Sequence, residues 1–235
     1  MDERRRLRGS VRMTLAFVAL IWSVKVIEFV FGLDLSEFGI LPRSLHGSIG
    51  IITGPLIHGD IFHLLSNTFP VLVLGMGILY FYHGIAPAVL SMIYLMTGFW
   101  VWIAGREAYH IGASGLVYGM LTFLLMSGFM RKDRSTLALS FVILFLYGGS
   151  FFAGIIPEES HISWESHLMG AIAGIFCAIY FKSYKLSAQL QPSASEDEEA
   201  PVTHYNYTYV PGAKENSPKK YINTIDRDQL DQKQD

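Results

Sequence analysis

Three side chains of this 235-residue chain stand out as candidates for covalent chemistry: a serine and two histidines in three separate apolar segments. Ser114 lies in a stretch of small residues, Gly112–Gly115, whereas His63 and His167 lie near the starts of two other segments. A serine hydroxyl becomes a nucleophile when a neighbouring histidine takes its proton. The question for the fold is therefore whether it brings Ser114 to a histidine.

A second polar group lies in the segment that follows Asp60. His63 and Asn67 are four residues apart, so they share one face if the segment is helical. Aspartate is a favoured residue at a helix N-terminus, and we predict that a helix begins directly after Asp60. A lone histidine at a helix start usually packs at an interface, but a histidine with an asparagine one turn deeper favours a functional pair.

The elements that must position these residues are membrane helices. Hydrophobic residues make up 51% of the chain and charged residues 16%, against about a quarter charged in soluble domains. The apolar residues gather into six runs that approach the roughly 20 residues needed to cross a bilayer. These runs are Val11–Phe31, Ile61–Tyr82, Ala86–Ala104, Ala113–Met130, Leu137–Ile156 and His167–Phe181. We predict an all-α membrane protein with a bundle of six transmembrane helices.

Basic residues predict the orientation of these helices, because Lys and Arg are retained on the cytoplasmic side. With six spans, three basic clusters fall on one side of the membrane. The clusters are Arg4, Arg5, Arg6, Arg8 and Arg12; Arg131, Lys132 and Arg134; and Lys182 with Lys185. We therefore expect a multi-pass protein of the cell (inner) membrane with both termini in the cytoplasm.

This topology places three polar residues at one depth. The second, fourth and sixth helices all run from outside to inside, and His63, Ser114 and His167 each lie near the start of one of them. Polar groups inside a membrane are costly and usually functional. Glycines on the fourth and sixth helices, Gly115 with Gly119 and Gly170 with Gly174, would let these two helices approach closely. We expect a site just below the outer surface.

The composition also indicates how the chain is divided and which other functions are excluded. Residues 1–10 form a basic cytoplasmic N-terminus, residues 11–185 the membrane domain, and residues 186–235 a polar tail that we predict to be disordered. Cys177 is the only cysteine, which excludes an internal disulfide and a thiolate-rich metal site. A net charge of −2 does not suit nucleic-acid binding. We expect no cofactor and no metal.

In combination these motifs resemble the rhomboid family of intramembrane serine proteases, over roughly residues 10–185. The motifs that carry the resemblance are Gly112-Ala113-Ser114-Gly115, His167 with Gly170 and Gly174, and His63 with Asn67. His58 also stands where rhomboids commonly carry a histidine. Tyr118 stands where bacterial rhomboids carry a tyrosine that packs on the catalytic histidine.

The resemblance implies a bundle of six transmembrane helices with a Ser114–His167 dyad and no acidic third member. Ser114 would form an acyl-enzyme after His167 takes its proton, and Tyr118 would orient the imidazole. The oxyanion hole would comprise His63, Asn67 and the backbone N–H of Ser114. The supporting residues would be Gly112, Gly115 and His58.

The resemblance also implies the substrates, which are single-pass transmembrane proteins that unwind near the outer face of the membrane. They would enter between the second and fifth helices, and the loop Pro157–Ser166 would cap the site. Only the protein, its substrate and the lipid bilayer are needed, and a monomer suffices. One departure is that the first outer loop, Gly32–Gly54, lacks the Trp-Arg pair of many rhomboids; Arg43 would take part of its role.

Other readings of the sequence lead to different classes of protein. A catalytically inactive rhomboid-like protein that binds membrane clients is the main alternative, but such proteins typically lose the serine or the histidine. A transporter would leave the glycines around Ser114 unexplained, and no internal repeat is evident. A zinc metalloprotease would need a His-Glu-x-x-His motif, which is absent from the sequence. An aspartyl protease would need two aspartates within the spans, and the six runs contain none.

Overall fold

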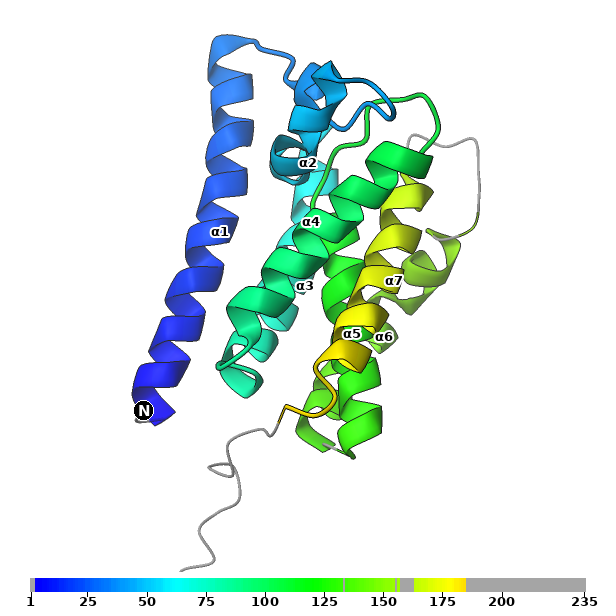
Figure 1. Cartoon of the computed structure of the whole chain (residues 1–235). Helices are drawn as coiled ribbons and strands as arrows, with labels where there is room; N and C mark the ends of the chain where they lie inside the picture. The colour runs from blue at the N-terminus through cyan, green and yellow to red at the C-terminus, as the bar shows by residue number, and fades with distance from the viewer. Residues whose placement is uncertain (1–2, 133, 155, 157–162, 185–235) are drawn as a thin grey trace, which may run out of the picture. The chain divides into compact units, whose positions relative to one another are not determined.

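A computed structural model describes residues 3–132, 134–154, 156 and 163–184 of the chain (Figure 1). The predicted tail, residues 186–235, lies outside the described residues. So does most of the outer loop expected to cap the site, residues 157–162. The cytoplasmic N-terminus predicted for residues 1–10 is helical from Glu3 onward.

Six long helices occupy the positions of the six apolar runs, which confirms the predicted fold class. They are α1 (Glu3–Phe31), α3 (Ile61–Phe81), α4 (Ala86–Ala104), α5 (Ser114–Arg131), α6 (Arg134–Ala153) and α7 (Trp164–Tyr180). The first outer loop adds the short helix α2 (Gly50–Thr53) and the 3-10 turns Ser36–Phe38, His46–Ile49 and Gly54–Leu56. Across the described residues the structure contains no β-strand, only an isolated bridge between Ile40 and His110.

Three helices begin earlier than predicted, and one of them is α6, which starts at Arg134 instead of Leu137. α1 starts at Glu3 instead of Val11, because the residues before Val11 include several arginines, which favour the helical conformation and extend the helix toward the N-terminus. α7 starts at Trp164 instead of His167, because the Ser163 hydroxyl accepts a hydrogen bond from the backbone N–H of Ser166 and caps the helix. His167 is therefore the fourth residue of α7 and not its first.

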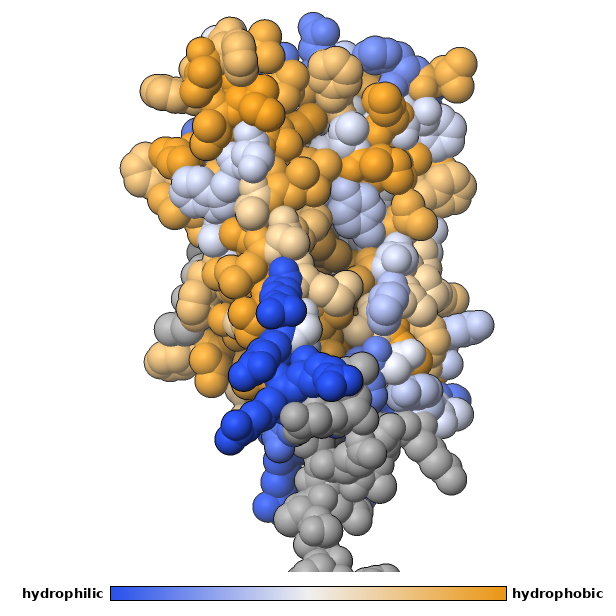
Figure 2. Space-filling view, turned by 90° about the vertical axis from the view of Figure 1, so that its left-hand side faces the viewer, coloured by the Kyte–Doolittle hydropathy of each residue, from blue (hydrophilic) through white to orange (hydrophobic). Residues whose placement is uncertain are grey.

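The helices differ in how apolar they are. α1, α3 and α4 are each long and apolar enough to cross a membrane. α5 and α7 are shorter, with 18 and 17 residues, and more than half of the residues in each are buried. The face of the molecule that contains α1 is largely apolar, with hydrophilic side chains gathered toward the N-terminal end of that helix (Figure 2). This distribution fits a protein that crosses a membrane several times.

α5 is the central helix, in contact with α3, α4, α6 and α7. Its closest neighbour is α7, and glycines make that contact possible. A Cβ atom on Gly170 would lie 2.0 Å from the carbonyl oxygen of Gly115, and one on Gly174 would lie 2.1 Å from that of Gly119. The Thr122 hydroxyl also donates to the Ala171 carbonyl oxygen at 2.9 Å across the interface. The two helices that carry Ser114 and His167 therefore meet backbone to backbone.

The first outer loop is tied to the end of α4. The Arg43 guanidinium donates to the Gly105 carbonyl at 2.8 Å, and the Trp102 indole N–H donates to the Ser44 carbonyl at 2.8 Å. The backbone N–H of Arg43 donates to the Trp102 carbonyl at 2.8 Å. The loop thus has an arginine beside a tryptophan after all, but the tryptophan comes from α4.

Candidate active site

α3, α5 and α7 all begin at one end of the bundle (Figure 1). Ser114 and His167 meet at this end. Ser114 is the first residue of α5, and His167 lies in the first turn of α7. The Ser114 Oγ atom lies 2.7 Å from His167 Nε2, which is a hydrogen-bond distance. His167 is 6% exposed, so most of the imidazole is shielded. The two residues singled out by type and depth are in direct contact.

The other ring nitrogen of His167 determines which way this bond runs. Nδ1 lies 2.7 Å from the carbonyl oxygen of Gly154, directly after α6. A carbonyl can only accept, so Nδ1 carries the proton and Nε2 presents a lone pair to the Ser114 hydroxyl. The Gly154 carbonyl therefore holds the imidazole in the tautomer of a base. Sequence reasoning missed this contact because a backbone carbonyl has no residue-type signature.

Tyr118 lies one turn after Ser114 on α5 and packs on the imidazole. The rings of Tyr118 and His167 are stacked, with their centroids 4.2 Å apart and their planes 5° from parallel. Tyr118 is itself 6% exposed, so its ring is held by the surrounding helices. The stack restricts rotation of the His167 ring and leaves Nε2 facing Ser114.

The His63 ring lies against the backbone that leads into Ser114. A Cβ atom on Gly112 would lie 2.6 Å from His63 Cε1 and 2.7 Å from Nε2, so only a glycine admits the ring at this distance. Gly112 also has φ of +104°, which side chains other than glycine rarely adopt. The close approach of the His63 ring and the positive φ are therefore two separate reasons for a glycine at position 112.

Asn67 lies one turn further along α3 and is buried. Its amide nitrogen donates to the His63 carbonyl oxygen at 2.8 Å, and the second amide hydrogen remains for another acceptor. The Asp60 carboxylate caps α3 by accepting the His63 N–H at 2.8 Å, as predicted. His63 therefore projects from a well-anchored first turn, and Asn67 lies one turn further along the same helix.

His58 contacts the backbone segment that leads into Ser114. Its Nε2 accepts a hydrogen bond of 3.3 Å from the backbone N–H of Ala113, and its ring lies edge-on to that of His63 with centroids 5.1 Å apart. The side chain is 1% exposed, and burial lowers the pKa of His58 to about 4. His58 is thus a neutral acceptor that holds the residue before Ser114.

This burial should make folding sensitive to acid. Between pH 6.5 and about 4 the unfolded chain protonates His58 and the folded chain does not, so stability is full above pH 6.5 and falls below it. The loss is at most about 3 kcal/mol. Thermal unfolding in micelles over this pH range should fall less steeply for His58→Gln, whose amide can still accept the Ala113 N–H. His46→Gln, at an exposed histidine, should lose thermal stability with falling pH as wild type does. If the unfolding temperature of His58→Gln fell as steeply as that of wild type, the prediction would be contradicted.

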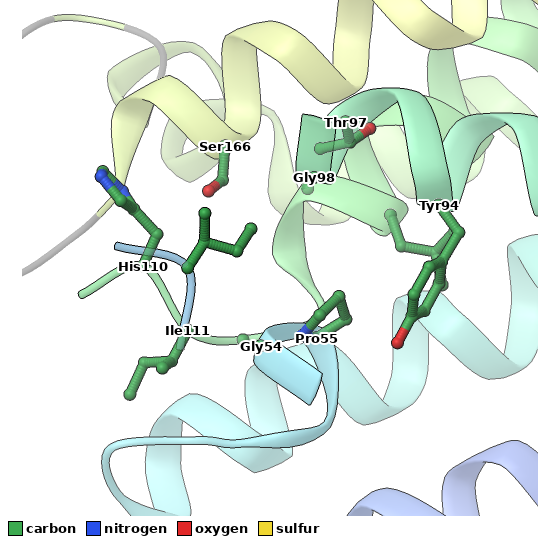
Figure 3. Close-up of a pocket in the computed structure, with 12 residues that line it drawn as sticks. Gly54, Pro55, Tyr94, Thr97, Gly98, His110, Ile111 and Ser166 are labelled. Carbon is green, nitrogen blue, oxygen red and sulfur yellow. The ribbon is translucent and has the colours of Figure 1, made fainter. Parts of the chain in front are cut away.

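A small pocket lies beside the site, between the first outer loop and the helices α4, α5 and α7. It leaves about 20 Å³ open, enough for one water molecule. Thr97, His110 and Ser166 line it together with apolar side chains and the backbone of Gly112 and Gly115 (Figure 3). The Thr97 hydroxyl is buried and has no hydrogen-bond partner among the described residues. The pocket therefore offers a buried hydroxyl that can hydrogen-bond to a water molecule.

Within the part of the chain that the structure describes, no three residues of the types His, Cys, Asp and Glu are grouped to hold a metal ion. His58 and His63 are neighbours but lack a third such ligand there.

The sequence is also similar to a known domain family and to several known proteins. Residues 46–184 match the Rhomboid domain family. Uncharacterized protein Rv1337 of Mycobacterium tuberculosis is 36% identical over 184 residues, 74% of each chain. Uncharacterized protein ML1171 of Mycobacterium leprae is 34% identical over 200 residues, 80% of this chain and 76% of that protein. RHOMBOID-like protein 6, mitochondrial, of Arabidopsis thaliana is 27% identical over 142 residues, 54% of this chain and 41% of that protein.

Proposed function

The chain belongs to the rhomboid family, and we propose that it is an intramembrane serine endopeptidase that cleaves single-pass transmembrane proteins near the outer face of the cell membrane. The observation that carries the proposal is the 2.7 Å bond between Ser114 Oγ and His167 Nε2, with the Nδ1 proton held by the Gly154 carbonyl. This is the arrangement in which a serine can lose its proton as it attacks.

The proposed reaction has two halves. Ser114 Oγ attacks the scissile carbonyl carbon while its proton passes to His167 Nε2, and the resulting imidazolium then gives that proton to the leaving amine. An acyl-enzyme remains on Ser114. A water molecule, deprotonated by the same nitrogen, then releases the acid and regenerates the serine. We propose that this water molecule binds in the pocket next to Gly115 before it reacts.

The surroundings of the dyad suit the charges that this reaction develops. The Gly154 carbonyl and the face of the Tyr118 ring both stabilise a positive imidazole, in place of an acidic third member. For the negative oxygen, we assign the Ser114 N–H, the His63 ring and the Asn67 amide. The N–H of a first helical residue has no acceptor within its helix, so it is available for an oxyanion.

The alternative is an inactive member of the family that binds membrane clients. The intact hydrogen bond between Ser114 and His167 favours the protease. A fluorophosphonate probe distinguishes the two, because it forms a covalent bond only with an activated serine. Incubation of the purified protein with the probe should add its mass to the peptide that contains Ser114. Absence of that adduct, with no cleavage of a transmembrane reporter, would favour the client-binding alternative.

Asn67→Ala should lower kcat by about 100-fold, the smaller end of the effect of removing one oxyanion donor, because two other donors remain. KM should change little, since the amide acts on the charge of the transition state. The comparison variant is Ser66→Ala, whose exposed hydroxyl donates to the same His63 carbonyl. Reporter cleavage in liposomes should be near normal for Ser66→Ala. Equal kcat in the two variants would remove Asn67 from the proposed oxyanion hole.

A further inference from the structure

A buried polar cluster connects the two segments that carry Ser114 and His167. We call it the His110 cluster; its members are Arg106, His110, Ser163, Glu165 and Ser166. His110 lies four residues before Ser114, and Ser163 lies four residues before His167. His110 and Glu165 are only 2% and 3% exposed. Burial of this kind is costly for ionisable side chains, so the cluster needs a structural or functional reason.

His110 is held in place by its own backbone. Its N–H and carbonyl form a bridge with Ile40 of the first outer loop, through two hydrogen bonds of 2.9 Å each. Its Nε2 lies 3.1 Å from the Arg106 carbonyl oxygen, within the loop that leads to α5. The histidine is therefore a fixed point of the outer loops.

The remaining nitrogen of His110 reaches across to α7. Because the Arg106 carbonyl can only accept, Nε2 carries the proton and Nδ1 accepts the Ser163 hydroxyl at 2.6 Å. Burial lowers the pKa of His110, which favours this neutral form. The ring lies directly against the start of α7 (Figure 3).

Ser163 links His110 to the first turn of α7. Its Oγ accepts the backbone N–H of Ser166 at 3.2 Å and lies 2.7 Å from the Ser166 Oγ. The Ser163 carbonyl oxygen accepts the backbone N–H of His167 at 3.3 Å. A single residue thus bonds both to His110 and to the backbone of His167.

Glu165 closes the cluster from the other side. Its Oε1 lies 3.6 Å from Arg106 Nε and accepts the Arg106 backbone N–H at 3.4 Å. Its Oε2 lies 3.9 Å from His110 Nδ1, is buried, and has no hydrogen-bond partner among the described residues. The carboxylate therefore joins the first turn of α7 to the loop that leads to Ser114.

We propose that His110 is a positioning residue for the proposed proteolysis. Its bond to Ser163 fixes the start of α7 relative to the start of α5, and so keeps His167 Nε2 at bonding distance from Ser114 Oγ. The glycine contacts set how closely α5 and α7 approach, whereas the His110 cluster sets where the two helix starts lie along that contact. A misplacement of about 1 Å can cost about 100-fold in rate. This role rests on the proposed function.

Two variants test the contacts of the two ring nitrogens of His110 separately. The amide of His110→Asn lies where Nδ1 lies and can still bond to Ser163, whereas the amide of His110→Gln lies where Nε2 lies and keeps only the Arg106 contact. We expect kcat for reporter cleavage to fall by about 100-fold in His110→Gln and to stay within about 3-fold of wild type in His110→Asn. KM and the unfolding temperature should be similar in the two variants. Tyr109→Phe, at the exposed neighbour, controls for changes in this loop.

A double variant tests the link itself. If His110 acts through Ser163, Ser163→Ala should cost much less kcat in the His110→Gln background than in wild type. Equal kcat losses in His110→Gln and His110→Asn, or losses that follow the unfolding temperature, would reduce the cluster to a structural role. A wild-type protein that neither cleaves the reporter nor takes the fluorophosphonate label would overturn the proposed function, and the positioning role with it.

Discussion

Ser114→Ala should abolish cleavage of a membrane-anchored reporter and leave the protein folded. Removal of the nucleophile or the base of such a pair typically lowers kcat by a factor on the order of 10⁶, which places the residual rate below detection. The fold should persist because alanine is the best helix former at the start of α5. The lost hydroxyl makes its hydrogen bond with His167 Nε2, and the helix backbone does not depend on that bond.

The measurement is cleavage in liposomes, together with fluorophosphonate labelling of the purified variant. Ser91→Ala, at an exposed serine on α4, is the matched control and should cleave and label as wild type does. His167→Ala should lose as much as Ser114→Ala, and the double variant should be no worse than either, because the two residues act as one unit. Appreciable cleavage by Ser114→Ala would refute the nucleophile, and with it the protease.

Gly170→Leu should remove both activity and a large part of the folded protein. A Cβ atom at this position already falls 2.0 Å from the Gly115 carbonyl oxygen and 2.8 Å from its carbonyl carbon. Both are backbone atoms, which cannot turn aside as a side chain can, so α5 and α7 must separate. Separation by even about 1 Å breaks the bond between Ser114 and His167 and costs about 100-fold in rate. The rest of the leucine side chain adds overpacking of about 1–3 kcal/mol or more.

Size-exclusion chromatography and thermal unfolding in detergent would measure the fold, and probe labelling the site. The control is Gly9→Leu on α1, where a Cβ atom would meet nothing within 4 Å. It introduces the same side chain into a membrane helix without a clash, and its unfolding temperature and labelling should match wild type. A Gly170→Leu protein with normal stability and labelling would show that α5 and α7 do not need their backbone contact.

Much of the site could be read from the sequence because membrane proteins tie depth to position along the chain. Six apolar runs predicted six helices, and alternating direction placed His63, Ser114 and His167 at one end of the bundle. The Asp60 cap followed from residue type alone. The sequence did not reveal that α1 begins at Glu3. It also gave no sign that Trp102 of α4 lies beside Arg43, since the two residues are far apart in the chain.

The sequence by itself determined which residues share a depth, because a helix rises by a constant distance per residue and the bilayer has a nearly constant thickness. Only the tertiary structure decided which of those residues touch. The backbone contact of Gly115 with Gly170 brings Ser114 Oγ to 2.7 Å from His167 Nε2, and the Gly154 carbonyl selects the tautomer. The bond between His110 and Ser163 was also invisible beforehand. Lateral distance and ring orientation arise from packing between helices, which no local pattern encodes.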